Sequence, residues 1–198
     1  MTDIQQDGRA RRQQDIFDLN RTKLIDTAVD VINEVGDIRE VTLTQIAKEA
    51  GVSPATAYNH FPDRMEDVFS AIVHARMDVA ANMGATLADE SLSVIEKLKQ
   101  IPVTYAENLV SLGYAGKVIV VQMFNLVNVN KWLDQDPVQA ITALLSNSDQ
   151  YHDRADEIAV NMATAFRGAM FEYALNIGDH ELFNRYSEEF FLKTSENL

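Results

Sequence analysis

The chain has 198 residues and a formal net charge of −13, with 46% hydrophobic and 24% charged residues. These proportions are those of an ordinary globular protein and exclude bulk disorder. The absence of cysteine excludes structural disulfides and thiolate metal sites. The acidic surplus argues against a nucleic-acid partner, because phosphate contacts need cations, unless the cations are concentrated in one region.

The N-terminal segment, residues 1–20, is polar and carries both signs of charge. It lacks the apolar stretch of a signal peptide. The longest apolar block, residues 118–129, contains three polar residues and is shorter than the ~20 residues of a membrane-spanning helix. We therefore expect a cytoplasmic protein with no membrane partner. We expect residues 1–20 to form a flexible arm, with a helical extension as the alternative.

Apolar residues recur at helical spacing along the chain, which has only four Pro and eight Gly. This pattern predicts an all-α fold. The first helix is expected from about Arg21 to Val35, where Gly36 follows as a left-handed stop. Later helices are predicted at about residues 65–83, 91–112, 115–133, 137–145, 154–177 and 180–196.

The segment after the first helix predicts two short helices joined by a tight turn. Thr42 and Gln45 have the spacing of a capping box. Gly51 suits the turn, and Ser53 precedes Pro54 as the cap of the second helix. This is the arrangement of a helix-turn-helix. The spacing alone also fits a plain helical hairpin within a larger bundle.

The second of these helices carries no acidic residue, although the chain is rich in Asp and Glu. Thr and Asn can address base edges, and Tyr and His can reach phosphate. The side chains expected to be exposed are Pro54, Ala55, Thr56, Tyr58, Asn59 and His60.

This segment resembles the DNA-binding signature of the TetR family of transcriptional regulators. The specific resemblance covers about residues 21–69, a quarter of the chain. The matching elements are Thr42, the pair Ile46-Ala47, the run Ala50-Gly51-Val52-Ser53, the pair Thr56 and Tyr58, and His60-Phe61-Pro62 followed by a basic residue.

The resemblance implies a homodimer with two recognition helices in successive major grooves of a palindromic double-stranded DNA operator, ~34–36 Å apart. It assigns DNA contacts to Thr42, Thr44, Gln45, Pro54, Ala55, Thr56, Tyr58, Asn59, His60 and Arg64. Two positions depart from the family pattern: Ala55 stands where Gly or Pro is common, and Ala57 where Leu or Val is common. With few long polar side chains on this helix, we expect modest direct readout, with DNA shape and phosphate contacts contributing more.

The resemblance also implies a domain plan: an arm at 1–20, a helix-turn-helix domain at 21–66 and a helical regulatory and dimerisation domain at 67–198. A small apolar effector of unknown identity would bind in the last of these and modulate DNA binding by a regulator that we expect to be a repressor. An apolar cavity with a few polar anchors is how such sites are built. The candidate lining residues are Tyr105, Asn108, Met123, Phe124, Trp132, Met162 and Phe166. Side chains of these types at helical spacing are also common in a plain core.

The last two predicted helices carry wide apolar and aromatic stripes. Such a stripe can bury one side in the core and another against a partner. By the resemblance, this pair forms the dimer interface, whereas a purely intramolecular core is the alternative. The interface candidates are Gly168, Ala169, Met170, Tyr173, Phe183, Tyr186 and Phe190.

No catalytic or cofactor-binding pattern is found in the sequence. The four His stand apart at positions 60, 74, 152 and 180, without the spacing of a metal-binding pair. We therefore expect no enzyme activity, no catalytic residues, no metal and no cofactor. Two other hypotheses stay open: a helical ligand-binding or protein-interaction module with weak or no DNA binding, which the acidity motivates, and an all-α enzyme.

The charge is unevenly distributed. Residues 1–64 carry a net charge of −3, and residues 65–198 carry −10. Arg9, Arg11 and Arg12 place three cations near the N-terminus, where they could follow a groove or a phosphate backbone. The acidity therefore does not exclude DNA binding, but it predicts weak non-specific affinity and few phosphate contacts.

Overall fold

The computed structural model describes residues 3–127 and 137–175, without the side chains of residues 3–7, 9, 79–82, 124–127 and 137. The described residues are helical and contain no strand, which confirms the all-α prediction. They divide into two compact units, Met1–Ile72 and Val73–Leu198. The division falls six residues beyond the boundary expected after residue 66. It lies within one helix, α4, which spans Met65–Met77.

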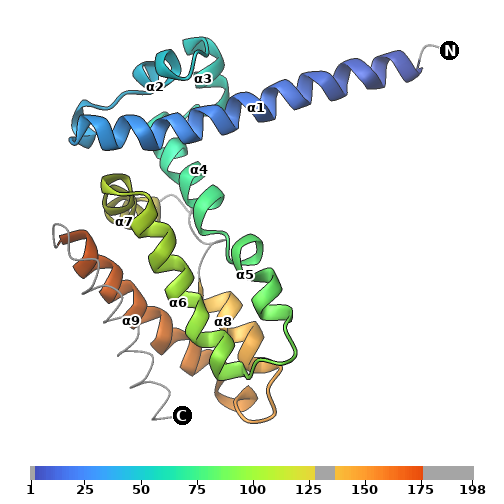
Figure 1. The fold of residues 1–198 in the computed structure, drawn as a ribbon, viewed down its shortest axis with the longest axis vertical. Helices are drawn as coiled ribbons and strands as arrows, with labels where there is room; N and C mark the ends of the chain where they lie inside the picture. Colours follow the sequence, from blue (N-terminus) through green and yellow to red (C-terminus); the bar gives the residue numbers. More distant parts are fainter. Residues whose placement is uncertain (1–2, 128–136, 176–198) are drawn as a thin grey trace. The chain divides into compact units, whose positions relative to one another are not determined.

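The N-terminal unit is built on a long first helix (Figure 1). It contains α1 (Asp3–Val35), the 3₁₀ turn η1 (Ile38–Glu40), α2 (Leu43–Glu49), α3 (Pro54–His60) and the start of α4. The C-terminal half of α1 packs against α2 and α3. Fully buried apolar side chains fill the space between them: Leu24, Ala28, Ile32, Ile46, Ala47, Ala57, Phe61 and Val68.

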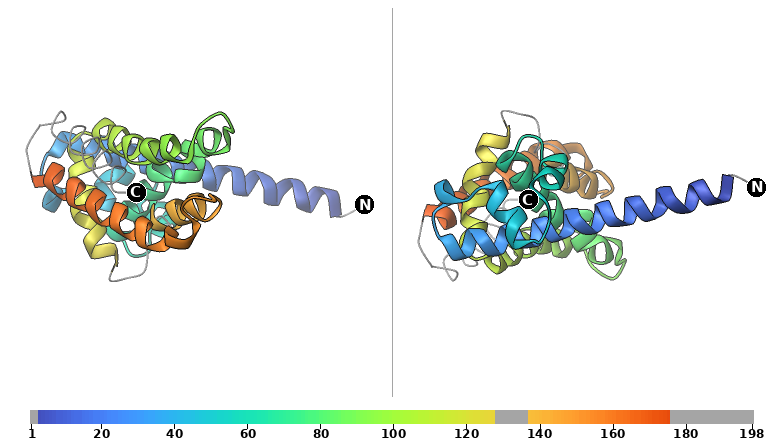
Figure 2. Two further views of the ribbon diagram at one scale, coloured as in Figure 1. Left: turned by 90° about the horizontal axis from the view of Figure 1, so that it is seen from below. Right: turned by 90° about the horizontal axis from the view of Figure 1, so that it is seen from above.

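Residues 3–20 belong to α1, so the expected flexible arm is replaced by the helical extension that was its alternative. Figures 1 and 2 show this part of α1 running beyond α2 and α3 toward the N-terminus. The side chains of residues 10–19 are exposed, including Ile16 and Leu19. The segment lacks Pro and has one Gly, and so it contains no strong helix breaker that would separate it from the rest of α1.

Local capping groups end and begin the short helices as predicted. The Thr42 side chain accepts a hydrogen bond from the Gln45 backbone N–H at 3.2 Å. Ser53 does the same for Thr56 at 3.1 Å, with Pro54 at the first helical position. Gly51 has φ +66°, the left-handed conformation that the turn requires.

The C-terminal unit holds the end of α4, α5 (Val79–Ala88), α6 (Val94–Ser111), α7 (Tyr114–Val127), α8 (Pro137–Ser146), the 3₁₀ turn η3 (His152–Arg154) and α9 (Ala155–Leu175). The single helix expected over residues 65–83 is interrupted at Asp78, a residue type whose carboxylate competes for nearby backbone groups. The predicted helix at 180–196 lies outside the described residues.

Helix α9 packs along α8 and also contacts α7, while α6 contacts α5, α7 and α8. A capping box between Ser93 and Glu96 begins α6. The α6–α7 corner is tight, because a Cβ added at Gly116 would collide with the carbonyl oxygen of Leu109. Among the described residues, no helix is both long and apolar enough to cross a bilayer.

Candidate nucleic-acid interface

Helices α2 and α3 expose several side-chain hydroxyl groups to solvent. Thr42 and Thr44 are exposed at the start of α2, and Tyr58 is 40% exposed on α3. The Thr44 Oγ1 and Tyr58 hydroxyl oxygens lie 3.5 Å apart, which links the two helices on their outer side. Hydroxyl groups placed in this way can donate hydrogen bonds to phosphate oxygens.

The N-terminal turn of α3 is held by its own cap. The hydroxyl oxygens of Ser53 and Thr56 lie 2.8 Å apart, and Thr56 is half-buried. Pro54 and Ala55 are exposed beside them, and Asn59 is exposed one turn later. This face can therefore offer small apolar groups and one amide to a ligand.

Arg64 has an unusual backbone conformation between α3 and α4. Its φ is +58°, a left-handed value that is rare for a residue with a side chain. Its N–H donates to the Phe61 carbonyl at 3.0 Å, and its own carbonyl accepts from the Val68 N–H at 3.2 Å. The Arg64 side chain is exposed, so its guanidinium remains accessible to an anion while the backbone closes the turn.

His60 does not face outward as expected. Its side chain is only 6% exposed, and neither ring nitrogen has a hydrogen-bond partner among the described residues. The ring packs against Phe17 of α1, with 3.9 Å between the ring centroids. Burial lowers the pKa of His60, and the nearby Arg21 cation lowers it further, whereas Asp18 opposes the shift. The assignment of His60 to a phosphate contact is therefore wrong, because α1 covers the ring.

Two residues of α1 that the sequence reasoning missed hold the C-terminal end of α3. Phe17 covers His60, and the Arg21 guanidinium donates to the His60 carbonyl at 3.2 Å. Arg21 also lies over the Phe61 ring, 5.0 Å from its centroid. Phe17 is the only aromatic residue in the polar segment 1–20, which could have marked it as a packing residue. Helical spacing alone could not show that it packs against His60.

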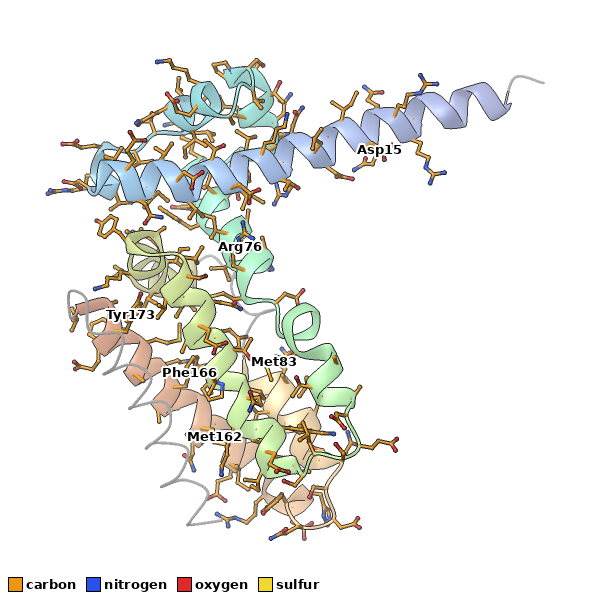
Figure 3. The ribbon with its side chains drawn as sticks, viewed as in Figure 1. Asp15, Arg76, Met83, Met162, Phe166 and Tyr173 are labelled. Atoms are coloured by element: carbon orange, nitrogen blue, oxygen red, sulfur yellow. The ribbon has the colours of Figure 1, made fainter. Side chains whose placement is uncertain are left out.

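Four of the seven effector-site candidates lie in the core of the C-terminal unit. Tyr105, Met123, Met162 and Phe166 are buried, and Asn108 is half-buried. The Tyr105 and Phe166 rings meet edge to face with 5.6 Å between centroids. The structure thus brings α6 and α9 together at these positions, and Figure 3 shows Met162 and Phe166 spaced along α9. The Phe124 side chain and Trp132 lie outside the described residues.

The interface candidates on α9 are split between two faces. Gly168 is exposed and Ala169 is half-buried. Met170 and Tyr173 are only 5% and 2% exposed, so their assignment to a dimer surface is wrong. Tyr173 instead packs inside the unit, with the Lys117 ammonium of α7 5.3 Å from its ring centroid.

The apolar residues that α9 does expose are Val160, Phe171 and Leu175. The remaining interface candidates Phe183, Tyr186 and Phe190 lie outside the described residues. Within the described residues, no group of three or more His, Asp or Glu side chains could hold a metal ion.

Comparison with known proteins finds relatives of the N-terminal unit. Residues 24–72 match the model of the family described as bacterial regulatory proteins, tetR family. A relative named HTH-type transcriptional regulator BetI, from Brucella anthropi, is 35% identical over 69 residues, which are 35% of each chain. A relative of the same name from Klebsiella pneumoniae is 36% identical over 78 residues, which are 38% of this chain and 40% of the relative.

The match thus spans only about a third of the length of these curated relatives. It falls on the helices that carry the exposed hydroxyl groups, Asn59 and Arg64. Residues 24–72, which include the helix-turn-helix, therefore match the tetR family of bacterial regulatory proteins.

Proposed function

We propose that this chain is a transcriptional regulator that binds a palindromic DNA operator as a homodimer and whose DNA affinity is modulated by a small apolar effector. The exposed α2–α3 face is the observation that carries the proposal. It combines hydroxyl groups at Thr42, Thr44 and Tyr58 with the Arg64 guanidinium. Helix α3 itself carries no carboxylate that would repel DNA.

The contacts follow from the helix positions. The first helix of a helix-turn-helix crosses the DNA backbone, and the second enters the major groove. Thr42, Thr44 and Tyr58 would hold phosphates on one side of the groove, and Arg64 would add one cation. Pro54, Ala55 and Asn59 would face the bases, as the exposure of all three allows.

The homodimer is supported by an exposed apolar stripe on α9. Val160, Thr164, Gly168, Phe171 and Leu175 recur at intervals of three and four residues and so share one helix face. Val160, Phe171 and Leu175 are 51%, 43% and 59% exposed. An apolar face of this kind marks an interaction surface, and the same helix of a second copy would cover it around a two-fold axis.

Regulation would follow from differential affinity. An effector shifts an equilibrium only by binding one of two states more tightly. The aromatic cluster of Tyr105 and Phe166 lies between α6 and α9, and α9 also carries the proposed dimer stripe. An effector beside this cluster would favour one arrangement of the two protomers, and the repressor would leave its operator when that arrangement no longer fits both half-sites.

The test is binding of the full-length chain to DNA from upstream of its own gene, measured by fluorescence anisotropy between 50 and 200 mM salt. The affinity should fall steeply with salt, because bound cations release counterions from phosphates. Tyr58→Ala should weaken binding about tenfold or more, since a hydrogen bond to a charged group contributes roughly 1.5–3 kcal/mol.

Tyr114→Ala is the matched control, because Tyr114 is 37% exposed on α7, close to the 40% of Tyr58. It should bind as the wild type does. If the folded wild-type chain binds no tested duplex at 50 mM salt, the proposal fails. The acidic composition would then favour a helical ligand-binding or protein-interaction module.

A further inference from the structure

The exposed face of α3 has an unusual composition for a helix that reads bases. Of its seven residues, Pro54, Ala55, Tyr58 and Asn59 are exposed, Thr56 is half-buried, and Ala57 and His60 are buried. The helix has no Arg, Lys, Asp or Glu. We propose, building on the function above, that α3 reads A·T base pairs, with Asn59 on an adenine and Ala55 against the methyl group of a neighbouring thymine.

The missing side chains exclude two of the four bases at these positions. Guanine is read chiefly by Arg or Lys, which donate to its O6 and N7, and cytosine by carboxylates, which accept from its N4. The face of α3 carries neither kind of group. Adenine is read by the amide of Asn or Gln, and thymine by apolar contact with its methyl group. Asn59 and Ala55 supply these two chemistries.

The other polar side chains of α3 are engaged elsewhere. The Tyr58 hydroxyl lies 3.5 Å from Thr44 Oγ1 on α2, and the Thr56 hydroxyl lies 2.8 Å from Ser53 Oγ. The Asn59 side chain is exposed and makes no hydrogen bond within the part of the chain that the structure describes. Ala55 and Asn59 are four residues apart and therefore lie on the same side of the helix. One helix face thus presents a methyl contact and an amide to adjacent base pairs.

Helix α2 does not change this expectation. Gln45 is half-buried in its first turn and, as an amide, also prefers adenine. Lys48 is exposed in the last turn of α2, the helix that crosses the DNA backbone in this motif. Lys48 would therefore contact phosphate and would not specify a base.

The first test is selection of bound duplexes from a random library by the full-length protein at one fixed salt concentration. The wild type should enrich half-sites with adjacent A·T pairs. Asn59→Ala should lose the preference for adenine at one position by roughly 5- to 150-fold, and Asn59→Arg should select guanine there. Gln139→Ala removes an exposed amide from α8 and, as the matched control, should leave the profile unchanged.

The second test isolates the methyl group. Replacing the thymine beside the mapped adenine by deoxyuridine removes only that methyl and should weaken wild-type binding about fourfold per half-site, the cost of exposing one methyl-sized group. Ala55→Gly should lose this sensitivity, because its side chain no longer meets the methyl. Ala85→Gly, an exposed alanine of α5, should retain it.

The outcomes separate the two proposals. Enrichment of G·C pairs at the position mapped by Asn59, or a profile that Asn59→Ala leaves unchanged, would overturn the A·T assignment while DNA binding stands. Equal binding of thymine and deoxyuridine duplexes would overturn the role of Ala55. If no duplex is enriched from the library, the proposed function fails and this inference fails with it.

Discussion

Arg64 combines a strained backbone with an exposed cation, and substitutions can separate the two. Among the described residues, Arg64 is the only non-glycine residue with a positive φ, which is +58°. A left-handed conformation costs a residue with a Cβ about 1–2 kcal/mol. Arg64→Gly removes that cost but adds about 0.4–1 kcal/mol of chain entropy to the unfolded state. Arg64→Ala keeps the strain. We therefore expect the glycine variant to exceed the alanine variant in stability by about 1 kcal/mol.

Both substitutions remove the same cation from the proposed DNA contact. Each lost phosphate contact should reduce the magnitude of the slope of log affinity against log salt by about 0.9. A homodimer loses one contact in each protomer, so its slope should fall by about 1.8. Arg64→Lys keeps the charge and should keep most of that slope, although it loses bidentate geometry.

Thermal unfolding followed by circular dichroism measures the first effect, and anisotropy over a salt series measures the second. A difference of about 1 kcal/mol corresponds to roughly 2–4 °C in a chain of this size. A glycine variant that melts below the alanine variant would refute the strain argument. An unchanged salt slope in both variants, with the fold intact, would refute the phosphate contact.

Three further predictions concern the buried His60, the α6–α7 corner and the proposed dimer surface of α9. Because the folded-state pKa of His60 lies below 6.5, the unfolded chain takes up its proton more readily. Stability should therefore fall as the pH drops through about 6.5 toward the lower folded-state pKa of His60. His60→Leu should flatten this part of a urea-unfolding series; an unaltered pH profile would contradict the burial argument. Gly116→Ala should cost about 1–3 kcal/mol, because the added Cβ meets the Leu109 carbonyl, and chemical denaturation that detects no loss would show that the corner can open. Phe171→Asp should convert the proposed homodimer to a monomer by light scattering and weaken operator binding, whereas an unchanged dimer mass would exclude the α9 stripe as the interface.

The helix-turn-helix could be predicted because its determinants are local. Thr42, Ser53 and Pro54 act within their own turns, and Gly51 meets a backbone requirement that few other residues satisfy. Periodicity likewise predicted the helical class. The exposed character of Pro54, Ala55, Tyr58 and Asn59 followed from the same local spacing and agrees with the structure.

The errors arose where tertiary packing decides. His60 has the spacing of an exposed residue at the end of α3, but Phe17, far away in the sequence, covers it. Met170 and Tyr173 belong to a stripe wide enough to face either the core or a partner, and the structure turns both inward. Helical periodicity identifies an apolar face but does not name what covers it.

In the proposed function, the α2–α3 face binds duplex DNA. Hydrogen–deuterium exchange of the full-length chain, with and without a selected duplex, tests it most directly because it locates the contact on the protein. DNA binding should slow exchange in the peptides that cover Thr42 to Arg64. Protection that omits these peptides, in a chain that binds the duplex, would contradict it.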